Sequence, residues 1–473
     1  MLFASPGIDT AAPKATRIDL FSAATPQMRA FHVTWLAFFV CFFAWFAAAP
    51  LMPLIKAEFG LSKDQIANIN IAAVAVTILV RLVVGPLCDR FGPRRTYTWL
   101  LLLGAIPVFG LAFAQTYETF LFFRLAIGAI GASFVITQYH TSVMFAPNVV
   151  GTANATVGGW GNAGGGAAQS LMPLVVAALV GLGVEHAFGW RAAMFVPGVA
   201  MVAMAFVYAR YTQDTPQGDI VDLRAAGIEL DGGKATGMAI FRRAAANYRT
   251  WMLAATYGAC FGVEIFIHNI AASYYVDRFG LSLTNAGLAA GIFGGLALFA
   301  RALGGIASDR IALSKGLDGR ALLLFALMLG EGVGLVLFGH AGSVTLAILA
   351  MTMFGLFTHM ACGATYALVP FIDRKALGGV AGLIGAGGNI GAVAAGFLNK
   401  ASATPQQCLI ILGYVVAGTA VCALAVRFSA THKSDERALL DAALDARRTS
   451  DRSVNGALPA CPPLPRLQPD WMI

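Results

Sequence analysis

The chain has 473 residues, of which 58% are apolar and only 12% are charged, with 32 Lys and Arg against 24 Asp and Glu. A soluble protein averages about 25% charged residues, so this composition excludes a soluble globular domain and indicates a chain that lies mostly in lipid. The net charge of +8 resides mainly in short loops and tails. Membrane orientation is therefore a simpler cause of the charge than nucleic-acid binding.

Residues 1–31 form a mixed, proline-containing segment that we predict to be a cytoplasmic amino tail. It differs from a secretory signal peptide, because the apolar run that begins near Phe31 is too long for a signal core. Twelve apolar runs follow, each close to the roughly 20 residues that a membrane-spanning helix needs. The first six lie near 32–55, 66–87, 97–115, 118–145, 150–182 and 190–211, and the second six near 250–275, 284–306, 320–339, 343–368, 377–399 and 406–427.

One polar stretch separates the two sets of apolar runs, and another follows the last run. Residues 212–249 are predicted to be a cytoplasmic linker, and residues 428–473 a cytoplasmic tail. The chain is therefore predicted to be an all-α membrane protein with two pseudo-symmetric six-helix halves, 32–211 and 250–427. With both termini and the linker on one side, that side holds 24 of the 32 Lys and Arg residues and the other side holds 5. Because positive charge concentrates on the cytoplasmic side, we expect both termini there, in an inner membrane.

The two halves share internal repeats. The pattern R-x-x-x-G-x-x-x-D-R occurs at 81–90 and again at 301–310, and each copy runs from a predicted span into the following loop. The pattern G-N-x-G occurs at 161–164 and at 388–391, in the fifth and eleventh spans. Paired halves with matching features are typical of transporters whose binding site lies between the repeats, near the middle of the membrane.

Three arginines lie within the predicted spans, namely Arg81, Arg124 and Arg301. An arginine near the bilayer centre costs at least about 2.5 kcal/mol, so it is expected to face a polar path and to meet a partner. The spans hold too few acidic residues to neutralise all three. We predict that Arg81 and Arg301, which the repeat places in matching positions, hold a small anion, because a guanidinium can bond two oxygens of a planar oxyanion. Arg124, near the start of the fourth span, is interpreted as structural.

Glycines cover one face of the fifth span and one face of the eleventh. Both sets follow helical spacing: Gly158, Gly161 and Gly165, and Gly378, Gly382 and Gly385. Bare faces of this kind let a neighbouring helix approach closely and slide. Asn162 and Asn389 lie on or beside these faces, and each is predicted either to contact the ligand or to bond across helices. The dinucleotide-type glycine pattern at 159–164 has no strand before it, so no nucleotide cofactor is expected.

The seventh span carries polar and aromatic residues on one face. Tyr257, Phe261, Glu264 and His268 follow helical spacing. A carboxyl inside a span can carry a proton, so Glu264 is the proton-coupling candidate, with a structural hydrogen bond as the alternative. Glu331 in the ninth span is a second candidate. None of the seven cysteines has a metal-binding or CxxC spacing, so no metal, disulfide or cofactor is expected.

Two sets of residues resemble a known family. The segment 85–95 is similar to the G-x-x-x-D-x-x-G-x-R/K gating loop of the major facilitator superfamily, and part of that pattern recurs in the second half. The residues concerned are Gly85, Asp89, Arg90, Gly92 and Arg94, and then Asp309 and Arg310. The glycine-asparagine runs at 158–166 and 382–391 resemble the paired signatures of the nitrate/nitrite porter family. The 261–264 stretch and the 214–216 stretch resemble its bacterial assimilatory and plant high-affinity branch.

The resemblance, which covers about residues 32–427, implies roles by position. Four residues match substrate-binding positions of the family: Arg81, Arg301, Asn162 and Asn389. Phe134 is similar to an aromatic residue that stacks on the anion, and Tyr257 and Phe261 are similar to the aromatic pair of the seventh span. Glu264 resembles an acidic residue of the assimilatory branch, where proton symport is usual.

The resemblance implies secondary active transport of nitrate or nitrite by alternating access, coupled to protons, in a chain that works as a monomer. Nitrate/nitrite exchange on the same scaffold, and a facilitator for another small anion, are the alternatives. Exchange would need no titrating carboxyl. A membrane-bound enzyme or sensor is disfavoured, because the sequence contains no catalytic constellation, metal spacing or soluble domain.

Overall fold

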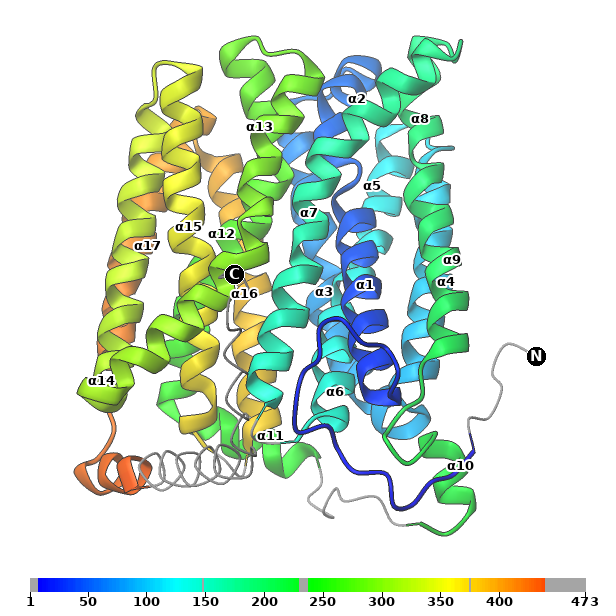
Figure 1. Ribbon diagram of the computed structural model, residues 1–473. Helices are drawn as coiled ribbons and strands as arrows, with labels where there is room; N and C mark the ends of the chain where they lie inside the picture. Colours follow the sequence, from blue (N-terminus) through cyan, green and yellow to red (C-terminus); the bar gives the residue numbers. More distant parts are fainter. Residues whose placement is uncertain (1–6, 147–148, 229–236, 374–375, 439–473) are drawn as a thin grey trace, which may run out of the picture.

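The computed structural model describes residues 7–146, 149–228, 237–373 and 376–438. Within these ranges nearly every segment is helical, and the helices form two bundles that stand side by side with the linker beneath them (Figure 1). Helices α1–α9 form the amino-terminal bundle and α12–α17 form the carboxy-terminal bundle. The end of the bundles at which α10 and α11 lie is called the linker end.

The helix bounds are as follows. The amino-terminal bundle contains α1 (Pro26–Phe46), α2 (Met52–Phe59), α3 (Lys63–Phe91), α4 (Pro93–Leu111), α5 (Tyr117–Ile127), α6 (Ser133–Met144), α7 (Val150–Gly181), α8 (Gly189–Ala193) and α9 (Phe195–Tyr211). The linker carries α10 (Ile220–Ala225) and α11 (Gly237–Ala246). The carboxy-terminal bundle contains α12 (Tyr248–Phe279), α13 (Leu283–Gly295), α14 (Ala297–His340), α15 (Val344–Leu368), α16 (Leu377–Ala401) and α17 (Pro405–Ala425).

Ten helical segments of the described chain are long and apolar enough to cross a membrane. One of them, Leu283–His340, has 58 residues and accounts for two spans, because the chain turns at Gly316. Gly316 has φ 60° and ψ −149°, a conformation that only glycine adopts readily. Helix α4, which has two arginines and several polar residues in its first turns, is the remaining span. The prediction of an all-α protein with twelve spans is therefore confirmed.

Side-chain caps begin five of the spans at the end opposite the linker. In each, a Ser or Thr hydroxyl accepts a hydrogen bond from the backbone N–H of the third helical residue, which satisfies a donor that the helix itself cannot. The capping residues are Ser62, Thr116, Ser282, Ser343 and Thr404. Each stands just before an apolar run, so these helix starts were readable in the sequence.

Two predicted elements differ from the structure in detail. The first span breaks after Phe46 into the 3₁₀ turn Ala49–Leu51 and then α2, because Pro50 and Pro53 lack the N–H groups that a continuous helix would use. The expected loop at 85–95 is almost absent. Helix α3 runs on to Phe91, and Gly92, with φ 84°, turns the chain directly into α4.

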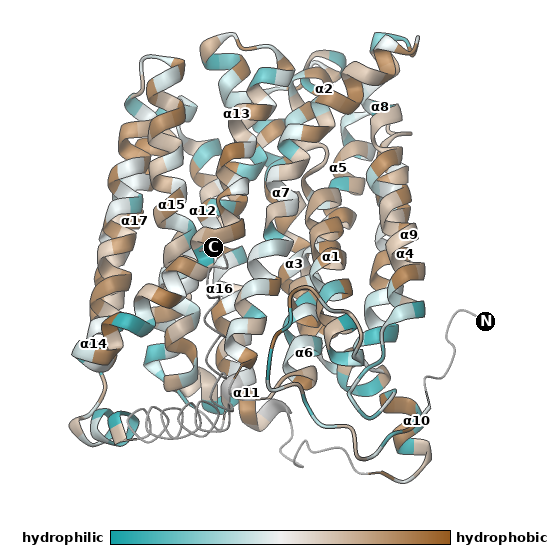
Figure 2. Cartoon of the chain, in the orientation of Figure 1, coloured by the Kyte–Doolittle hydropathy of each residue, from teal (hydrophilic) through white to brown (hydrophobic). Residues whose placement is uncertain are grey.

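The outer surface of the bundles is apolar over most of its height, and polar residues gather toward the two ends (Figure 2). Many large apolar side chains on this surface are exposed, among them Leu79, Trp99, Ile106, Phe122, Leu298 and Tyr414. In water such a surface would be unfavourable, whereas lipid solvates it without cost. The distribution fits a protein that spans a bilayer.

The two bundles meet along two pairs of helices. Helix α16 packs against α3, and α13 packs against α7. Glycine permits the closest approaches, since a Cβ at Gly166 of α7 would collide with the backbone of Gly294 in α13. The interface therefore pairs the second span with the eleventh and the fifth with the eighth.

Three lysines make polar contacts between the bundles at the end opposite the linker. These contacts are Lys56 with Asp277 (3.2 Å), Lys400 with Asn68 (3.0 Å), and Lys63 with the carbonyl of Ser402. In the linker-end parts of α3 and α16, by contrast, a Cβ at Gly85, Gly378 or Gly382 would meet no atom within 4 Å. The described part of the molecule is thus closed between the bundles at the end opposite the linker and open at the linker end.

Candidate functional site

Helix α3 carries Arg81 into the interface between the bundles. The residue is 8% exposed, and Nη1 donates to the carbonyl oxygen of Gly385 in α16 at 2.8 Å. With its amide oxygen turned toward the guanidinium, Asn389 of α16 accepts a hydrogen bond from the same nitrogen at 2.8 Å. The guanidinium carbon lies 5.5 Å from the centre of the Phe134 ring, within the range of a cation–π contact. An arginine of one bundle is therefore held by a helix of the other.

Helix α14 places Arg301 in the matching position. The residue is 7% exposed, and its Nη2 forms an ion pair with Oε2 of Glu264 in α12. The guanidinium carbon lies 5.5 Å from the centre of the Phe261 ring. Its aliphatic stem lies beside Gly159 of α7, so that this arginine also reaches the opposite bundle. Each bundle thus contributes one buried arginine and one aromatic ring beneath it.

Aromatic rings line the space between the two arginines. Tyr257 and Phe261 stack with their centres 5.0 Å apart, and Tyr366 of α15 meets Tyr257 at 5.1 Å and Phe134 at 6.1 Å. Tyr366 therefore joins the aromatic residues of the two bundles, a role that sequence reasoning missed. Tyr366 stands 227 residues after Tyr139, the same offset that separates the paired asparagines, and this repeat was the only signal available.

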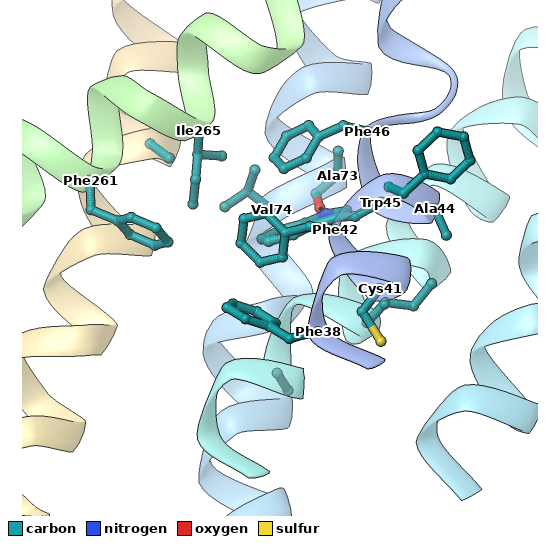
Figure 3. Packing of buried hydrophobic residues seen from close by; sticks show 14 of the residues in the cluster. Phe38, Cys41, Phe42, Ala44, Trp45, Phe46, Ala73, Val74, Phe261 and Ile265 are labelled. Atoms are coloured by element: carbon teal, nitrogen blue, oxygen red, sulfur yellow. Dashed lines mark hydrogen bonds between the residues drawn. The ribbon is translucent and has the colours of Figure 1, made fainter. Parts of the chain in front are cut away.

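The amino-terminal wall of the same region comes from α1. Figure 3 shows Phe38, Phe42 and Phe46 of α1 on the side of the helix that faces Phe261 and Ile265 of α12. All of these side chains are buried. Buried rings on both sides give the two arginines apolar surroundings, in which hydrogen bonds and charge interactions are stronger than in water.

Asn162 of α7 is fully buried, and neither its amide oxygen nor its amide nitrogen has a hydrogen-bond partner among the described residues. An unpaired buried amide costs about 1–3 kcal/mol, so such a group usually has a partner that the protein alone does not supply. The two paired asparagines therefore differ. Asn389 bonds to Arg81, whereas Asn162 keeps its donors and acceptor free.

The charges of this region do not balance. Arg81 has no carboxylate partner in the part of the chain that the structure describes, and Arg301 shares only Glu264. The two guanidinium groups and the one carboxylate that contacts them carry a net charge of +1 in a buried site. Because an unpaired buried charge is strongly unfavourable, this arrangement favours an anion between the arginines.

Arg124 lies apart from this pair. It is buried on α5, where Nη1 donates to the carbonyl of Trp45 at 3.0 Å and Nη2 donates to Oδ1 of Asn269 at 3.1 Å. Neutral acceptors from both bundles satisfy two of its nitrogens. These contacts suit the structural interpretation of Arg124.

Most of the glycine face of α7 packs closely against neighbouring side chains, as expected, whereas part of the glycine face predicted on α16 does not. A Cβ at Gly161 would collide with the Phe38 ring, and one at Gly165 would press on His268. At Gly158 it would meet only ordinary contacts at 3.6 Å, and at Gly378 and Gly382 it would meet open space. Close packing of α16 instead falls on Gly387, Gly388 and Gly391, which face α12 within the same bundle. Gly378 and Gly382 are open because they lie at the linker end, where the bundles separate.

The gating-loop residues form a polar cluster at the linker end. The Asp214 carboxylate, just after α9, lies where a Cβ of Gly92 would stand, and it accepts hydrogen bonds from the backbone nitrogens of Arg94 (2.8 Å) and Ile220 (2.9 Å). Arg94 also pairs with Asp219 at 2.6 Å in a fully buried contact. Burial and the nearby Asp219 carboxylate raise the pKa of Asp214 to about 7. This cluster ties α4, α9 and α10 together.

The remaining loop residues are more exposed. Arg224 of α10 donates to the carbonyl oxygens of Asp89 (2.7 Å) and Arg90 (3.0 Å), and Gly85 has open space beside it. In the second copy, Asp309 pairs with Arg320 at 2.7 Å, while Arg310 lies at the surface. The second copy thus lacks the buried carboxylate cluster of the first, in keeping with its partial sequence pattern.

Comparison with known proteins extends this description. The Major Facilitator Superfamily profile matches residues 34–396. A high affinity nitrate transporter (2.5) of Arabidopsis thaliana is 42% identical over 382 residues, which cover 80% of this chain and 75% of the relative. The nitrate/nitrite transporter NrtP of Nostoc punctiforme is 29% identical over 433 residues, covering 78% of this chain and 86% of the relative.

Solved structures share the fold at low sequence identity. A bacterial homologue of the human lysosomal transporter Spinster, in an inward-facing and occupied conformation, aligns with a TM-score of 0.62 at 14% identity, covering 86% of this chain and all of that one. The fucose:proton symporter of E. coli aligns with a TM-score of 0.57 at 14% identity, over 85% of this chain and 100% of that chain. At these identities the likeness concerns the fold alone.

Proposed function

We propose, because this chain belongs to the major facilitator superfamily and within it to the nitrate/nitrite porter family, that it carries nitrate across a membrane. The observation that carries this proposal is the pair of buried arginines, one from each bundle, of which only Arg301 has a carboxylate partner among the described residues. A planar anion between two guanidinium forks would supply the missing negative charge. Relatives named as nitrate transporters and nitrate/nitrite transporters support the same cargo.

The residues of the site have distinct proposed roles. Arg81 and Arg301 bind the anion from opposite bundles, and Asn162 donates its free amide N–H to an anion oxygen. Asn389 orients Arg81 and shares the anion with it. The rings of Phe134, Tyr257 and Phe261 stack around the flat anion and exclude water, which strengthens each hydrogen bond.

Transport is proposed to proceed by alternating access in a monomer whose halves rock about the central site. We place both termini and the linker in the cytoplasm, because that side would hold most of the Lys and Arg residues. The structure is then open toward the cytoplasm and closed toward the outside. The membrane is proposed to be the inner membrane.

Proton-coupled symport is the preferred mode, with Glu264 as the proton-coupling carboxyl. Its ion pair with Arg301 supports this role, since an anion that takes Arg301 would leave Glu264 uncompensated unless a proton neutralised it. The same ion pair also supports the second candidate, nitrate/nitrite exchange. In an exchanger, Glu264 would remain ionised as a fixed partner of Arg301 throughout the cycle.

The test is nitrate uptake into proteoliposomes with and without an inward proton gradient, for the wild type and for Arg81→Lys and Arg301→Lys. Lysine keeps the charge but loses the planar fork, so each variant should lose at least about tenfold in uptake. Arg278→Lys, at the outer end of α12, is the matched control and should transport as the wild type does.

The outcomes separate the candidates. Accumulation by the wild type only with the gradient supports symport, and uptake only against internal nitrite supports exchange. If the wild type moves neither anion, or if both lysine variants transport normally, the arginine site is not a nitrate site.

A further inference from the structure

Glu264 of α12 lies among polar side chains from two other helices of the carboxy-terminal bundle. Its Oε2 pairs with Arg301 of α14, lies 3.5 Å from Nδ1 of His359 in α15, and accepts a 3.8 Å contact from the thiol of Cys362. Its Oε1 has no hydrogen-bond partner among the described residues. Both Glu264 and His359 are completely buried.

The tautomer of His359 follows from its other contact. Nε2 lies 3.0 Å from the carbonyl oxygen of Phe293, and a carbonyl can only accept, so Nε2 carries the hydrogen. In the neutral ring Nδ1 is then a bare acceptor, and it faces the Glu264 carboxylate, which is also an acceptor. Two acceptors 3.5 Å apart repel each other, and one proton between them would turn this contact into a hydrogen bond.

We propose that Glu264 and His359 together form the proton-binding site, and that the bound proton replaces Arg301 as the partner of Glu264 when nitrate occupies Arg301. The proposal rests on the proposed transport of nitrate. It adds a second residue, His359, and an order of events to the coupling carboxyl named above.

The cycle balances in charge and in bonds. In the empty carrier Glu264 is ionised and paired with Arg301. A proton enters from the outer side and bonds to Oε2 or Nδ1, and Arg301 is released to bind the incoming nitrate. When nitrate leaves toward the linker end, Arg301 pairs with Glu264 again and the proton departs on the same side. Nitrate competes with Glu264 for Arg301, and the proton competes with Arg301 for Glu264. Binding of nitrate and binding of the proton therefore depend on one another.

His268 does not offer an equal alternative to His359. Among the described residues, the other ionisable side chains near the pair are Arg301 and Glu331 on α14, Cys362 on α15, and Tyr257, Cys260 and His268 on α12. His268 packs its ring against Phe46 and Phe293, and neither ring nitrogen has a hydrogen-bond partner among the described residues. Nothing therefore sets the tautomer of His268, whereas a backbone carbonyl sets that of His359.

The test compares two transport modes in proteoliposomes containing the full chain. Exchange of isotopically labelled nitrate at equal pH needs no net proton movement, while accumulation under an inward proton gradient does. His359→Gln keeps an N–H donor that can reach the Phe293 carbonyl and removes Nδ1. It should lose about tenfold or more of the gradient-driven accumulation, because the proton site is incomplete. Exchange should also weaken, because protonation releases Arg301, and it should recover when the pH is lowered on both sides of the membrane. His268→Gln is the matched control and should keep both modes.

A second measurement does not depend on the variants folding. Nitrate added to the wild-type protein in weakly buffered detergent should draw up to about one proton per bound anion from solution, because binding and protonation are linked. An absence of proton uptake would overturn the proposal. So would gradient-driven accumulation that survives His359→Gln, or that is lost in His268→Gln instead. Failure of the wild type to transport nitrate at all would instead reject the proposed function itself.

Discussion

Arg81 and Arg301 occupy matching positions in the repeat, yet their surroundings are not equivalent. Arg81 is held by neutral acceptors, the carbonyl of Gly385 and the amide of Asn389, whereas Arg301 is held by the carboxylate of Glu264. The charge of Arg81 is therefore not compensated by a carboxylate and can pair with an anion directly, whereas Arg301 must first separate from Glu264. In the proposed mechanism, this asymmetry places the coupling step in the carboxy-terminal bundle.

Asn162 should separate ligand binding from structural support. Replacing it by Ala leaves a small cavity, but it also removes a buried amide that has no partner among the described residues. Because the second effect offsets the first, the free energy of unfolding should stay within about 1 kcal/mol of the wild type. Nitrate affinity should fall about tenfold, because a hydrogen bond to an anion contributes about 1.5–3 kcal/mol. Thermal unfolding in detergent and nitrate binding on the same samples measure both quantities.

Asn389→Ala is the companion variant. It should lower both stability and affinity, because Asn389 accepts hydrogen bonds from Arg81 in the unliganded protein. A clear loss of stability in Asn162→Ala would show that Asn162 bonds across helices instead.

At the scale of helices, the glycines of α16 differ in how closely they are packed. A Cβ at Gly391 of α16 would collide with the backbone of Gly258 in α12, while a Cβ at Gly378 of the same helix would meet open space. Gly391→Val should therefore destabilise the protein by more than about 2 kcal/mol, through overpacking against the backbone. Gly378→Ala should be neutral or stabilising by up to about 1 kcal/mol, because alanine favours a helix over glycine. Equal melting temperatures for the two variants would contradict this contrast.

The cluster of Asp214 links three elements and predicts a pH dependence. Its pKa is raised to about 7, so between about pH 4 and pH 7 the folded protein binds a proton that the unfolded chain has lost. The contribution of Asp214 to stability is therefore greatest at low pH and falls as pH rises through 7. Thermal unfolding from pH 5 to pH 8 should show the wild type losing stability relative to Asp214→Asn over this range. A constant difference between the two proteins would disprove the shift.

At the scale of the whole molecule, the structure is one state of a carrier with unequal ends. The bundles close at the end opposite the linker through α3 and α16, where a Cβ on Gly396 would lie 3.8 Å from the Cβ of Ile71. This spacing matches the Cβ–Cβ distance of a disulfide. The double variant Ile71→Cys and Gly396→Cys should therefore oxidise readily and lock this end shut.

The lock makes alternating access testable. The oxidised double variant should lose nitrate uptake, and a reducing agent should restore it. Each single cysteine variant should transport nitrate under both oxidising and reducing conditions. Uptake by the fully oxidised protein would mean that this end need not open during transport.

Four features follow from the local pattern of the chain: the twelve spans, the two halves, the family, and the matched positions of Arg81 and Arg301. Apolar length and internal repeats express these features directly, since each span must satisfy its own backbone in lipid. The tertiary structure alone decided that Glu264 is the partner of Arg301, that Tyr366 joins the aromatic residues, that the close-packing glycines of α16 are Gly387 to Gly391, and which end is open. These features depend on which helix faces meet and on how two separate bundles rest against each other. That arrangement arises from contacts between residues far apart in the chain, and the local sequence pattern does not report such contacts.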